Sequence, residues 1–426
     1  MKKIGFVEEN RLSIYKQCQF LEKEKKHTFF ARNNYKFVYR KNSKKMKILI
    51  VCNNAYMRGN GICTAVLSLV ERLQKEGIEA RVMSCANPDL SGKQPDYPLE
   101  HFKFPIFEPL IENNGFRYAT FDRNIALKAI AWADVVHLQE GFPMEAKVAR
   151  LARKMGKPCV GTFHMFSENI LANLGLKRDR VLNYLITQWW RNSIYDLCSH
   201  VHCPTEVVKQ HLLKHKFSAE MRVFSNGMDI TDTEFTPYIP SNDPIVILCI
   251  GRFANEKSQN TLLDAMRFSK YADRIQLHFA GKGPRQKRYE RLAKKLLTDG
   301  IVKYPPKFGF YDHMELKKLI RSAYLYIHCA WVEVEGLSCA EAIREGVVPI
   351  IAEGNLTATS QFALDDRSTF PASNARALAE KIDWWIEHPE QRIEMGQKYA
   401  ESIKRFNADN TIQQMIQMYR DSIAQC

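Results

Sequence analysis

The sequence predicts an α/β protein with two domains, each built on a doubly wound parallel sheet. A chain of 426 residues is too long for one ordinary hydrophobic core, so two domains of about 200 residues each are expected. Both halves of the chain alternate short apolar runs with amphipathic segments, a pattern typical of βαβ units. Between the halves, residues 236–244 hold three prolines among short polar residues, which indicates a linker. We therefore expect an N-terminal domain at 46–240 and a second domain at 241–406.

The first strand is expected at 47–52, where an apolar run is followed by a polar loop and an amphipathic helix at 62–76. The next strand follows at 78–84. The loop ends with Gly59 and Gly61, and glycines at a first βα turn let the backbone approach a phosphate or a sugar closely. Because the loop lacks the GxGxxG spacing, a dinucleotide-binding dehydrogenase is disfavoured.

Polar side chains mark the ends of two further strands of this domain. His137 and Gln139 close a strand that begins near Asp134, and His164 closes the strand at 159–164. Their place at the carboxyl edge of a parallel sheet makes them candidates for orienting a substrate. Glutamine can hydrogen-bond a hydroxyl group but cannot act as a base near pH 7. His164 either orients a substrate or is a buried histidine whose bonds are satisfied by the core.

Two segments of the N-terminal domain are candidates for an acceptor surface. Residues 95–121 are rich in proline and aromatic residues. The basic residues 177–180 precede an apolar stretch at 181–191 that contains Trp189 and Trp190. Helices with basic and aromatic residues lie in membrane interfaces, although core helices with a charged end show the same pattern.

The second domain is expected to open with a strand at 245–250, whose following loop carries Arg252 and Lys257. A second strand at 276–280 is followed by a loop that contains Gly283. Both loops fall at the carboxyl edge of the sheet, where open α/β sheets bind ligands.

The most informative segment is 324–352, which reads as a strand, a loop, a short helix and a second strand. The loop carries Glu333, and Glu341 lies about one turn into the helix. The backbone N–H groups of Gly336, Leu337 and Ser338 open the helix and would face an anion. An anion site between two carboxylates suits a ligand with a phosphate at one end and hydroxyl groups at the other. A nucleotide sugar is such a ligand.

The spacing of Glu333 and Glu341 resembles the Glu-x7-Glu signature of the retaining glycosyltransferases of family 4, which have the GT-B fold. This resemblance implies two Rossmann-like domains facing across a cleft, with the last helix, at about 407–426, returning to the N-terminal domain. It implies a UDP-sugar donor and neither a cofactor nor a metal ion. Two cations can stabilise charge on the departing diphosphate in place of a metal.

The resemblance also implies roles for individual residues. Glu333 would contact the donor sugar, and Arg252 and Lys257 would hold the diphosphate. Sugar-orienting roles would fall to His137, Gln139 and His164, although many family members carry a histidine where this chain has Gln139. Donor binding would fall to a larger set: Gly61, Gly59, Gly283, Gly336, Leu337, Ser338 and Glu341.

The local sequence 333–342 is most similar to bacterial enzymes that glycosylate diacylglycerol or related membrane lipids. Glu335 stands where many family members carry an aromatic residue, which favours this branch. The implied reaction moves glucose or galactose to a lipid hydroxyl such as that of diacylglycerol or ceramide, forming an α-glycolipid. Two alternatives are a capsule or exopolysaccharide glycosyltransferase acting on a lipid-linked saccharide, and a sugar-nucleotide epimerase of the same fold.

The charge is concentrated at the N-terminus. Residues 1–45 contain thirteen Lys and Arg against four Glu, which accounts for +9 of the formal +15. This basic extension is either a membrane-facing arm or a disordered extension, or it precedes the real start codon at Met46. Without a signal peptide or a long apolar run, the sequence predicts a cytoplasmic protein held peripherally at the anionic inner face of the cell membrane. It carries no motif of a nucleic-acid-binding module, so nucleic acid is not expected as a partner.

Overall fold

The computed structural model describes residues 45–57, 61–105, 108–113, 116–176, 179–230 and 244–426. By its internal contacts the chain divides after Met46 into a short N-terminal unit and a large unit, Lys47–Cys426. Residues 1–44 of the basic extension, Gly59 and most of the linker at 236–244 lie outside the described residues. Within the described residues, no helix combines the length and the apolar character needed to cross a bilayer.

The first lobe is built on a seven-stranded, all-parallel sheet with the order β3-β2-β1-β6-β7-β8-β9. Its strands are β1 (Lys47–Val51), β2 (Glu79–Cys85), β3 (Tyr97–Leu99), β6 (Val135–Leu138), β7 (Cys159–Thr162), β8 (His200–Cys203) and β9 (Glu220–Val223). A small antiparallel pair of strands, β4 (His101–Phe102) and β5 (Tyr118–Ala119), lies between β3 and β6 in the chain. The central strands are buried along their length, as their apolar runs predict.

Helices follow the strands of the first lobe. They are α2 (Gly61–Lys75), α3 (Glu108–Asn113), α4 (Arg123–Trp132), α5 (Pro143–Lys154), α6 (Ser167–Asn173), α7 (Arg180–Ser193) and α8 (Glu206–Lys214). The strand, helix and strand expected at 47–84 are confirmed as β1, α2 and β2. The helix expected at 181–191 is confirmed as α7. Its N-terminus is capped by Asp179, whose side chain accepts a hydrogen bond from the Leu182 N–H.

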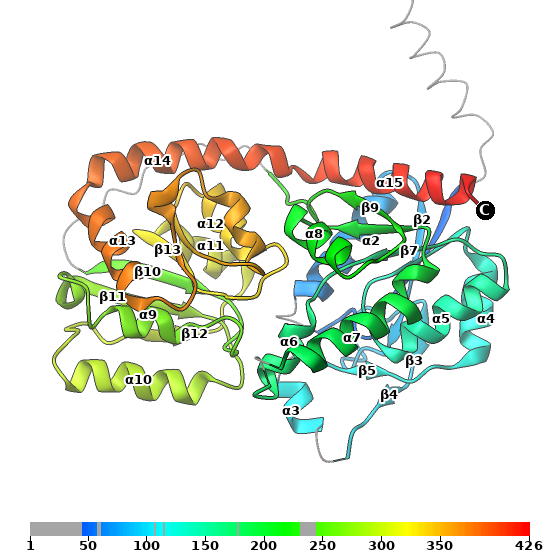
Figure 1. Cartoon of the computed structure of the whole chain (residues 1–426), viewed down its shortest axis with the longest axis horizontal. Coiled ribbons are helices and arrows are strands. Elements are labelled where there is room, and N and C mark those ends of the chain that lie inside the picture. Colours follow the sequence, from blue (N-terminus) through cyan, green and yellow to red (C-terminus); the bar gives the residue numbers. More distant parts are fainter. Residues whose placement is uncertain (1–44, 58–60, 106–107, 114–115, 177–178, 231–243) are drawn as a thin grey trace, which may run out of the picture. The chain divides into compact units, whose positions relative to one another are not determined.

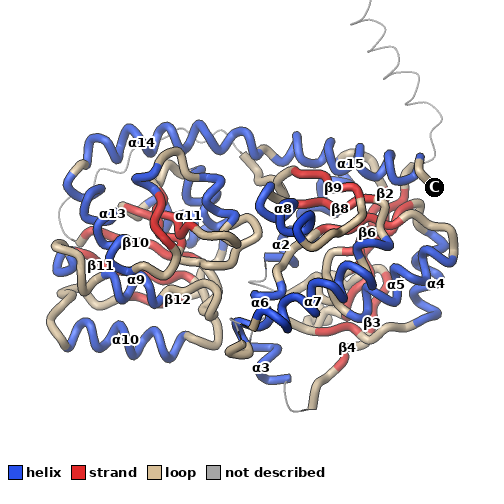
Figure 2. The backbone as a smooth tube through the Cα atoms, in the orientation of Figure 1, coloured by secondary structure: helices blue, strands red, loops and turns tan. Residues whose placement is uncertain are grey.

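The second lobe holds a six-stranded parallel sheet with the order β12-β11-β10-β13-β14-β15. Its strands are β10 (Ile245–Ile250), β11 (Ile275–Ala280), β12 (Lys307–Gly309), β13 (Leu325–His328), β14 (Pro349–Glu353) and β15 (Thr369–Pro371). Its helices are α9 (Asn260–Ala265), α10 (Gln286–Thr298), α11 (His313–Arg321), α12 (Leu337–Arg344), α13 (Ala375–Glu387) and α14 (Pro389–Ser402). Short 3-10 turns lie at Tyr195–Leu197, Ala272–Arg274, Ala358–Phe362, Asp366–Ser368 and Ile403–Phe406. Figure 2 shows the strands of each sheet enclosed by helices.

The last helix, α15 (Ala408–Ala424), packs against the first lobe, as the resemblance implied (Figure 1). The Tyr419 hydroxyl bonds His137 at 2.7 Å, and Ser422 bonds Ser199 at 2.7 Å. The chain therefore passes from the first lobe to the second before β10 and returns between α14 and α15. Each lobe has its own apolar core, and each sheet reverses its strand order once, between β1 and β6 and between β10 and β13. Ligands of open α/β sheets bind at such reversals.

Candidate active site

Three loops meet at the carboxyl edge of the second sheet, at the reversal between β10 and β13. The loop after β11 is joined to the loop after β10 by two backbone bonds, Phe253 N–H to Lys282 O at 3.1 Å and Arg285 N–H to Phe253 O at 2.9 Å. The loop after β13 is joined to the β10 loop by a bond from Trp331 N–H to Glu256 O at 3.0 Å. The segments that carry Arg252, Lys257 and Glu333 are thus held together by the backbone itself.

Lys257 and Glu333 form an ion pair within this group of loops. The two residues belong to different loops and are largely shielded from solvent. His328 also contacts the Glu333 carboxylate, with its Nε2 atom 3.2 Å from Oε2. Burial alone would raise the pKa of Glu333, but Lys257 and the His328 bond outweigh it and hold that pKa well below its usual value. Glu333 is therefore a fixed anion at neutral pH.

A relay of hydrogen bonds connects Glu333 to the start of α12. The Tyr326 hydroxyl lies 3.1 Å from His328 Nδ1 and 3.0 Å from the Ser338 hydroxyl. Burial lowers the pKa of His328, so its ring is neutral and carries one proton. Because the carboxylate can only accept, that proton sits on Nε2, and donation runs from Ser338 to Tyr326 to His328 to Glu333. Sequence reasoning missed Tyr326 and His328. They are two positions apart and share one face of β13, but the apolar run in which they lie indicates only a buried strand.

Arg252 lies in the same loop as Lys257 and pairs with Glu256. The Glu256 side chain is almost fully buried, whereas the Arg252 side chain is 28% exposed. The Gln259 side-chain amide donates to the Arg252 carbonyl at 2.8 Å and fixes the turn beneath it. The Arg252 guanidinium group is thus paired with a buried carboxylate, and its side chain remains partly exposed.

Helix α12 opens with Gly336, whose φ of 88° requires the left-handed region. A Cβ added to Gly336 would lie 2.3 Å from Thr359 Oγ1, so the position also lacks room for a side chain. The first-turn N–H groups of Leu337 and Ser338 have no acceptor inside the helix. Glu341 is one turn further along, and burial raises the pKa of its carboxyl despite Arg344 and His313. The helix start, the relay and Lys257 therefore form one continuous cluster.

The remaining glycines of the predicted donor site differ in their surroundings. A Cβ on Gly283 would lie 2.6 Å from the Phe253 carbonyl oxygen, so this glycine is required for the two loops to touch. Gly61 is exposed as the first residue of α2, and a Cβ there would meet no atom within 4 Å. The fold thus explains Gly283 by close packing, while Gly61 stays a predicted contact of the donor.

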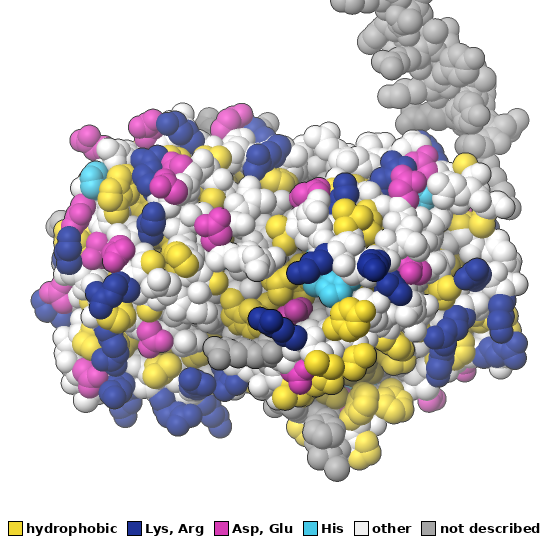
Figure 3. All heavy atoms as spheres, in the orientation of Figure 1, with side chains coloured by type: hydrophobic (Ala, Val, Ile, Leu, Met, Phe, Trp, Pro, Cys, Tyr) yellow, Lys and Arg dark blue, Asp and Glu magenta, His cyan; other side chains and the backbone are white. Residues whose placement is uncertain are grey.

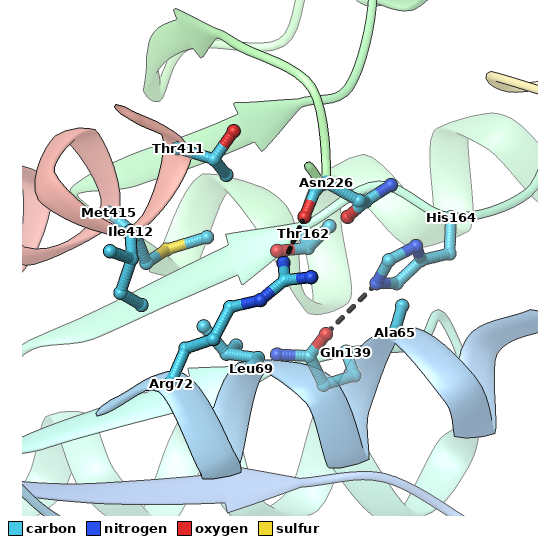
Figure 4. Close-up of a pocket in the computed structure, with 10 residues that line it drawn as sticks. All are labelled: Ala65, Leu69, Arg72, Gln139, Thr162, His164, Asn226, Thr411, Ile412 and Met415. Carbon is cyan, nitrogen blue, oxygen red and sulfur yellow. Dashed lines mark hydrogen bonds between the residues drawn. The ribbon is translucent and has the colours of Figure 1, made fainter. Parts of the chain in front are cut away.

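Gln139 and His164 lie together at the carboxyl edge of the first sheet, and both point into one small cavity (Figure 4). His164 Nε2 is 2.9 Å from Gln139 Oε1. Burial lowers the pKa of His164 to about 3, so its neutral ring donates from Nε2 and leaves Nδ1 as an acceptor. Among the described residues, the Gln139 Nε2 group is buried without a hydrogen-bond partner.

The cavity has a volume of about 20 Å³, which is enough for one water molecule. Its wall is completed by α2, α15 and the turn after β9, through Ala65, Leu69, Arg72, Thr162, Asn226, Thr411, Ile412 and Met415. An unpaired amide in a wall of this kind is a ready donor to a polar ligand atom.

The predicted sugar-orienting role of His137 is wrong. Its side chain is fully buried, and both ring nitrogens are occupied, Nδ1 by the Tyr419 hydroxyl and Nε2 by the Thr162 hydroxyl, each at 2.7 Å. Desolvation holds the pKa of His137 well below its usual value. His137 therefore ties α15 to the first sheet and has no free atom for a substrate.

Sequence reasoning also missed a buried carboxylate pair behind Gln139. The Asn53 backbone donates to Glu140 at 2.6 Å, and the Asn53 side-chain amide donates to Glu145 at 2.7 Å. Burial raises the pKa of both carboxyls, that of Glu140 to about 7. The pair therefore retains a proton at neutral pH and fixes the loops after β1 and β6.

Two family models match consecutive parts of the chain. Residues 59–232 match the model described as Glycosyltransferase Family 4, and residues 231–402 match the model described as Glycosyl transferases group 1. Together they span both lobes and the candidate site.

Individual proteins are also similar to this chain. An alpha-monoglucosyldiacylglycerol synthase from Streptococcus pneumoniae is 23% identical over 327 residues, which is 73% of this chain and 71% of that protein. The structure of Anabaena HepE in complex with UDP and glucose matches with a TM-score of 0.68 at 16% identity, over 88% of this chain and 100% of that one. The catalytic domain of a cholesterol-alpha-glucosyltransferase from Helicobacter pylori is 43% identical over 38% of this chain and 99% of that one, with a TM-score of 0.36.

Proposed function

Because the chain belongs to the GT-B glycosyltransferases of family 4 and group 1, we propose that it moves glucose or galactose from a UDP-sugar to a hydroxyl group of a membrane lipid. The product would be an α-glycolipid, formed with retention at the sugar, and the acceptor would be of the diacylglycerol or ceramide type. Relatives support both halves of this reaction, since one is named for diacylglycerol and a structural neighbour binds UDP with glucose.

On the donor side, the geometry suits a nucleoside diphosphate. Arg252, Lys257 and the first-turn N–H groups of α12 would stabilise negative charge as the sugar–phosphate bond breaks. The departing phosphate oxygen would then accept the proton of the acceptor hydroxyl on the same face. Glu333, held by Lys257 and His328, would orient the sugar hydroxyls, and Glu341 would bind the ribose.

The proposal of a lipid acceptor rests on one observation about α7. This helix is apolar on two opposite faces. Its inner face packs Trp190 against Gly141, where an added Cβ would lie 2.5 Å from the indole nitrogen. Its outer face exposes large apolar side chains, Val181 at 67%, Tyr184 at 54%, Leu185 at 55% and Trp189 at 39%. Figure 3 shows hydrophobic side chains gathered over this part of the molecule. Exposed apolar surface of this extent marks an interaction site.

The helix that carries this outer surface packs on α6, which follows His164. Helix α6 begins three residues after His164, and the Ser167 hydroxyl on α6 lies 3.2 Å from the Thr187 hydroxyl on α7. Leu174 and Leu176, which follow α6, are also exposed. A lipid that enters along α6 and α7 would therefore bring its headgroup to His164 and Gln139.

A basic face on the second lobe favours an anionic membrane. The buried residues of α10 are Tyr289, Ala293 and Leu296, and the opposite side of the helix carries Lys287, Arg291, Lys294 and Lys295, all exposed. Figure 3 shows Lys and Arg gathered over α10. Each basic residue near an anionic leaflet contributes about 1 kcal/mol of binding. The protein would thus act as a peripheral enzyme at the cytoplasmic face of the membrane.

The test is transfer from radiolabelled UDP-glucose and UDP-galactose to vesicles that contain diacylglycerol, ceramide or a sterol. We expect one new glycolipid that carries a single labelled sugar in the α configuration. Label that enters only a lipid-linked saccharide, or a donor converted to its epimer without any acceptor, would contradict the proposal.

The membrane surface is tested with Val181→Glu combined with Leu185→Glu. This variant should bind vesicles at least about 10-fold more weakly and keep its affinity for UDP, because two exposed apolar contacts become charged. Asn124→Glu, on the exposed side of α4, is the matched control and should bind vesicles like the wild type. Equal vesicle binding by both variants would exclude the outer face of α7.

A further inference from the structure

Glu335 is a buried carboxylate that the proposed reaction does not use. Its side chain is 3% exposed, and it lies in the loop of the second lobe that carries Glu333. Its hydrogen-bond partners among the described residues nevertheless all belong to the first lobe: the Ser225 hydroxyl, the Asn226 side-chain amide, and the Asn226 backbone N–H at 3.1 Å. A carboxylate with this many donors is strongly held, and breaking the set would leave buried groups unsatisfied.

The apolar neighbours of Glu335 make the same connection. Val332 and Val334 are buried in the core cluster of the first lobe, although they belong to the loop after β13 of the second. The Thr205 hydroxyl, also in the first lobe, donates to the Val334 carbonyl at 3.1 Å. Glu333, between the two valines, is turned the other way, to Lys257 and His328. One short loop therefore directs Glu333 to the donor side and contacts the first lobe through Val332, Val334 and Glu335.

The Ser225–Asn226 turn, to which Glu335 is bonded, borders the cavity beside Gln139. Asn226 lines that cavity, and its carbonyl accepts a bond of 3.1 Å from Arg72, which lines it too (Figure 4). Gly227, next in the chain, packs so closely on α15 that an added Cβ would lie 2.9 Å from Ala408. The Ser225–Asn226 turn is thus fixed on two sides by the first lobe and on the third by Glu335.

We propose that Glu335 is a positioning residue that clasps the Glu333 loop to the Ser225–Asn226 turn and so keeps the Gln139–His164 cavity aligned with the donor side. The clasp acts through Asn226 and touches neither substrate. The assignment of that cavity to the acceptor rests on the proposed function, whereas the clasp between the lobes does not.

If Glu335 has this role, its substitution should affect transfer to the acceptor and hydrolysis of the donor differently. Glu335→Ala should lower transfer to the acceptor by about 10- to 100-fold while UDP affinity and slow hydrolysis of the UDP-sugar stay within about twofold, because water needs no aligned cavity. Glu335→Gln keeps one acceptor oxygen and should recover much of the transfer rate. Ser225→Ala in the Glu335→Ala background should cost little more, since the two groups act as a unit.

Asn255→Ala is the matched control, because it removes a different bond between the lobes, from Asn255 Nδ2 to the Ala172 carbonyl at 2.7 Å. It should leave the ratio of transfer to hydrolysis unchanged. If Glu335→Ala lowers transfer, hydrolysis and UDP affinity together, or lowers none of them, Glu335 is not a positioning residue.

A second measurement is independent of the acceptor. Spin labels at Lys128→Cys on α4 and Lys287→Cys on α10, both exposed, report the distance between the lobes once Cys18 and Cys426 are replaced by Ser. Glu335→Ala should broaden or lengthen the distance distribution, and Asn255→Ala should not. An unchanged distribution in Glu335→Ala overturns the clasp, while a changed one in a protein that glycosylates no lipid overturns only the proposed function.

Discussion

Lys257 and Glu333, which are 76 residues apart in the chain, form an ion pair at the point where the second sheet reverses its strand order. The pair joins the loop after β10 to the loop after β13 and keeps the Glu333 carboxylate ionised.

Removing one member of this pair should destabilise the fold more than removing both. Lys257→Met leaves the Glu333 anion largely buried and should lower the free energy of unfolding by about 1–3 kcal/mol at pH 7. In Lys257→Met/Glu333→Gln most of that loss should be recovered. Because the folded pKa of Glu333 lies below its unfolded value, the stabilisation by the pair is present above pH ~4.5 and is lost as the pH falls. Urea unfolding of the three variants between pH 3 and pH 8 measures this, and equal losses at all pH values would contradict it.

Arg252→Ala should reduce turnover by about 10²–10³-fold, because the guanidinium group would stabilise charge that develops on the leaving diphosphate. Arg252→Lys should recover only part of the lost turnover, since lysine keeps the positive charge but not the two-pronged donor geometry of arginine. Steady-state kinetics with the preferred donor provide the test, with thermal unfolding to show that both variants fold. Wild-type turnover in a folded Arg252→Ala protein would remove Arg252 from the site.

Glu341→Ala should mainly weaken nucleotide binding. A carboxylate that accepts from two ribose hydroxyls makes charge-assisted hydrogen bonds, so the Kd for UDP should rise roughly 10- to 100-fold. Calorimetric titration with UDP and with uracil separates the ribose contact from the base contact. If UDP binds the variant as tightly as the wild type, Glu341 does not contact the ribose.

Glu145→Gln should stabilise the protein at high pH. The folded pKa of Glu140 is raised to about 7, so the stability that comes from keeping this pair protonated is complete below pH ~4.5 and is lost as the pH rises towards 7. Glutamine at 145 can donate to an ionised Glu140, which removes the loss. We expect a gain on the order of 1–3 kcal/mol at pH 8 and little gain at pH 4.5, measured by urea unfolding. Glu290→Gln, on the exposed side of α10, should show no such trend.

Local patterns in the sequence were enough to predict the βαβ unit around Glu333. The apolar run before it, the glycine with positive φ that opens α12 and the glycine that ends it, Gly346, all act within a few residues. The loops with Arg252 and Gly283 were predictable for the same reason, because strand order alone brings carboxyl ends to one edge.

Contacts between distant residues were not predictable in this way. His137 was assigned to the site because it ends a strand. Its Nδ1 atom is instead hydrogen-bonded to the hydroxyl of Tyr419, 282 residues later in the chain. The bonds of Glu335 to Ser225 and Asn226 span about 110 residues and leave no periodic signal. The one hint was chemical, because a carboxylate that is buried needs hydrogen-bond donors.

The most direct test of the central claim is a crystal structure of the protein with UDP. We expect the diphosphate at the reversal between β10 and β13, within hydrogen-bonding distance of Arg252, Lys257 and the N–H groups of Leu337 and Ser338, with the ribose on Glu341. A diphosphate bound elsewhere, with Arg252 and Lys257 still directed only at Glu256 and Glu333, would contradict it.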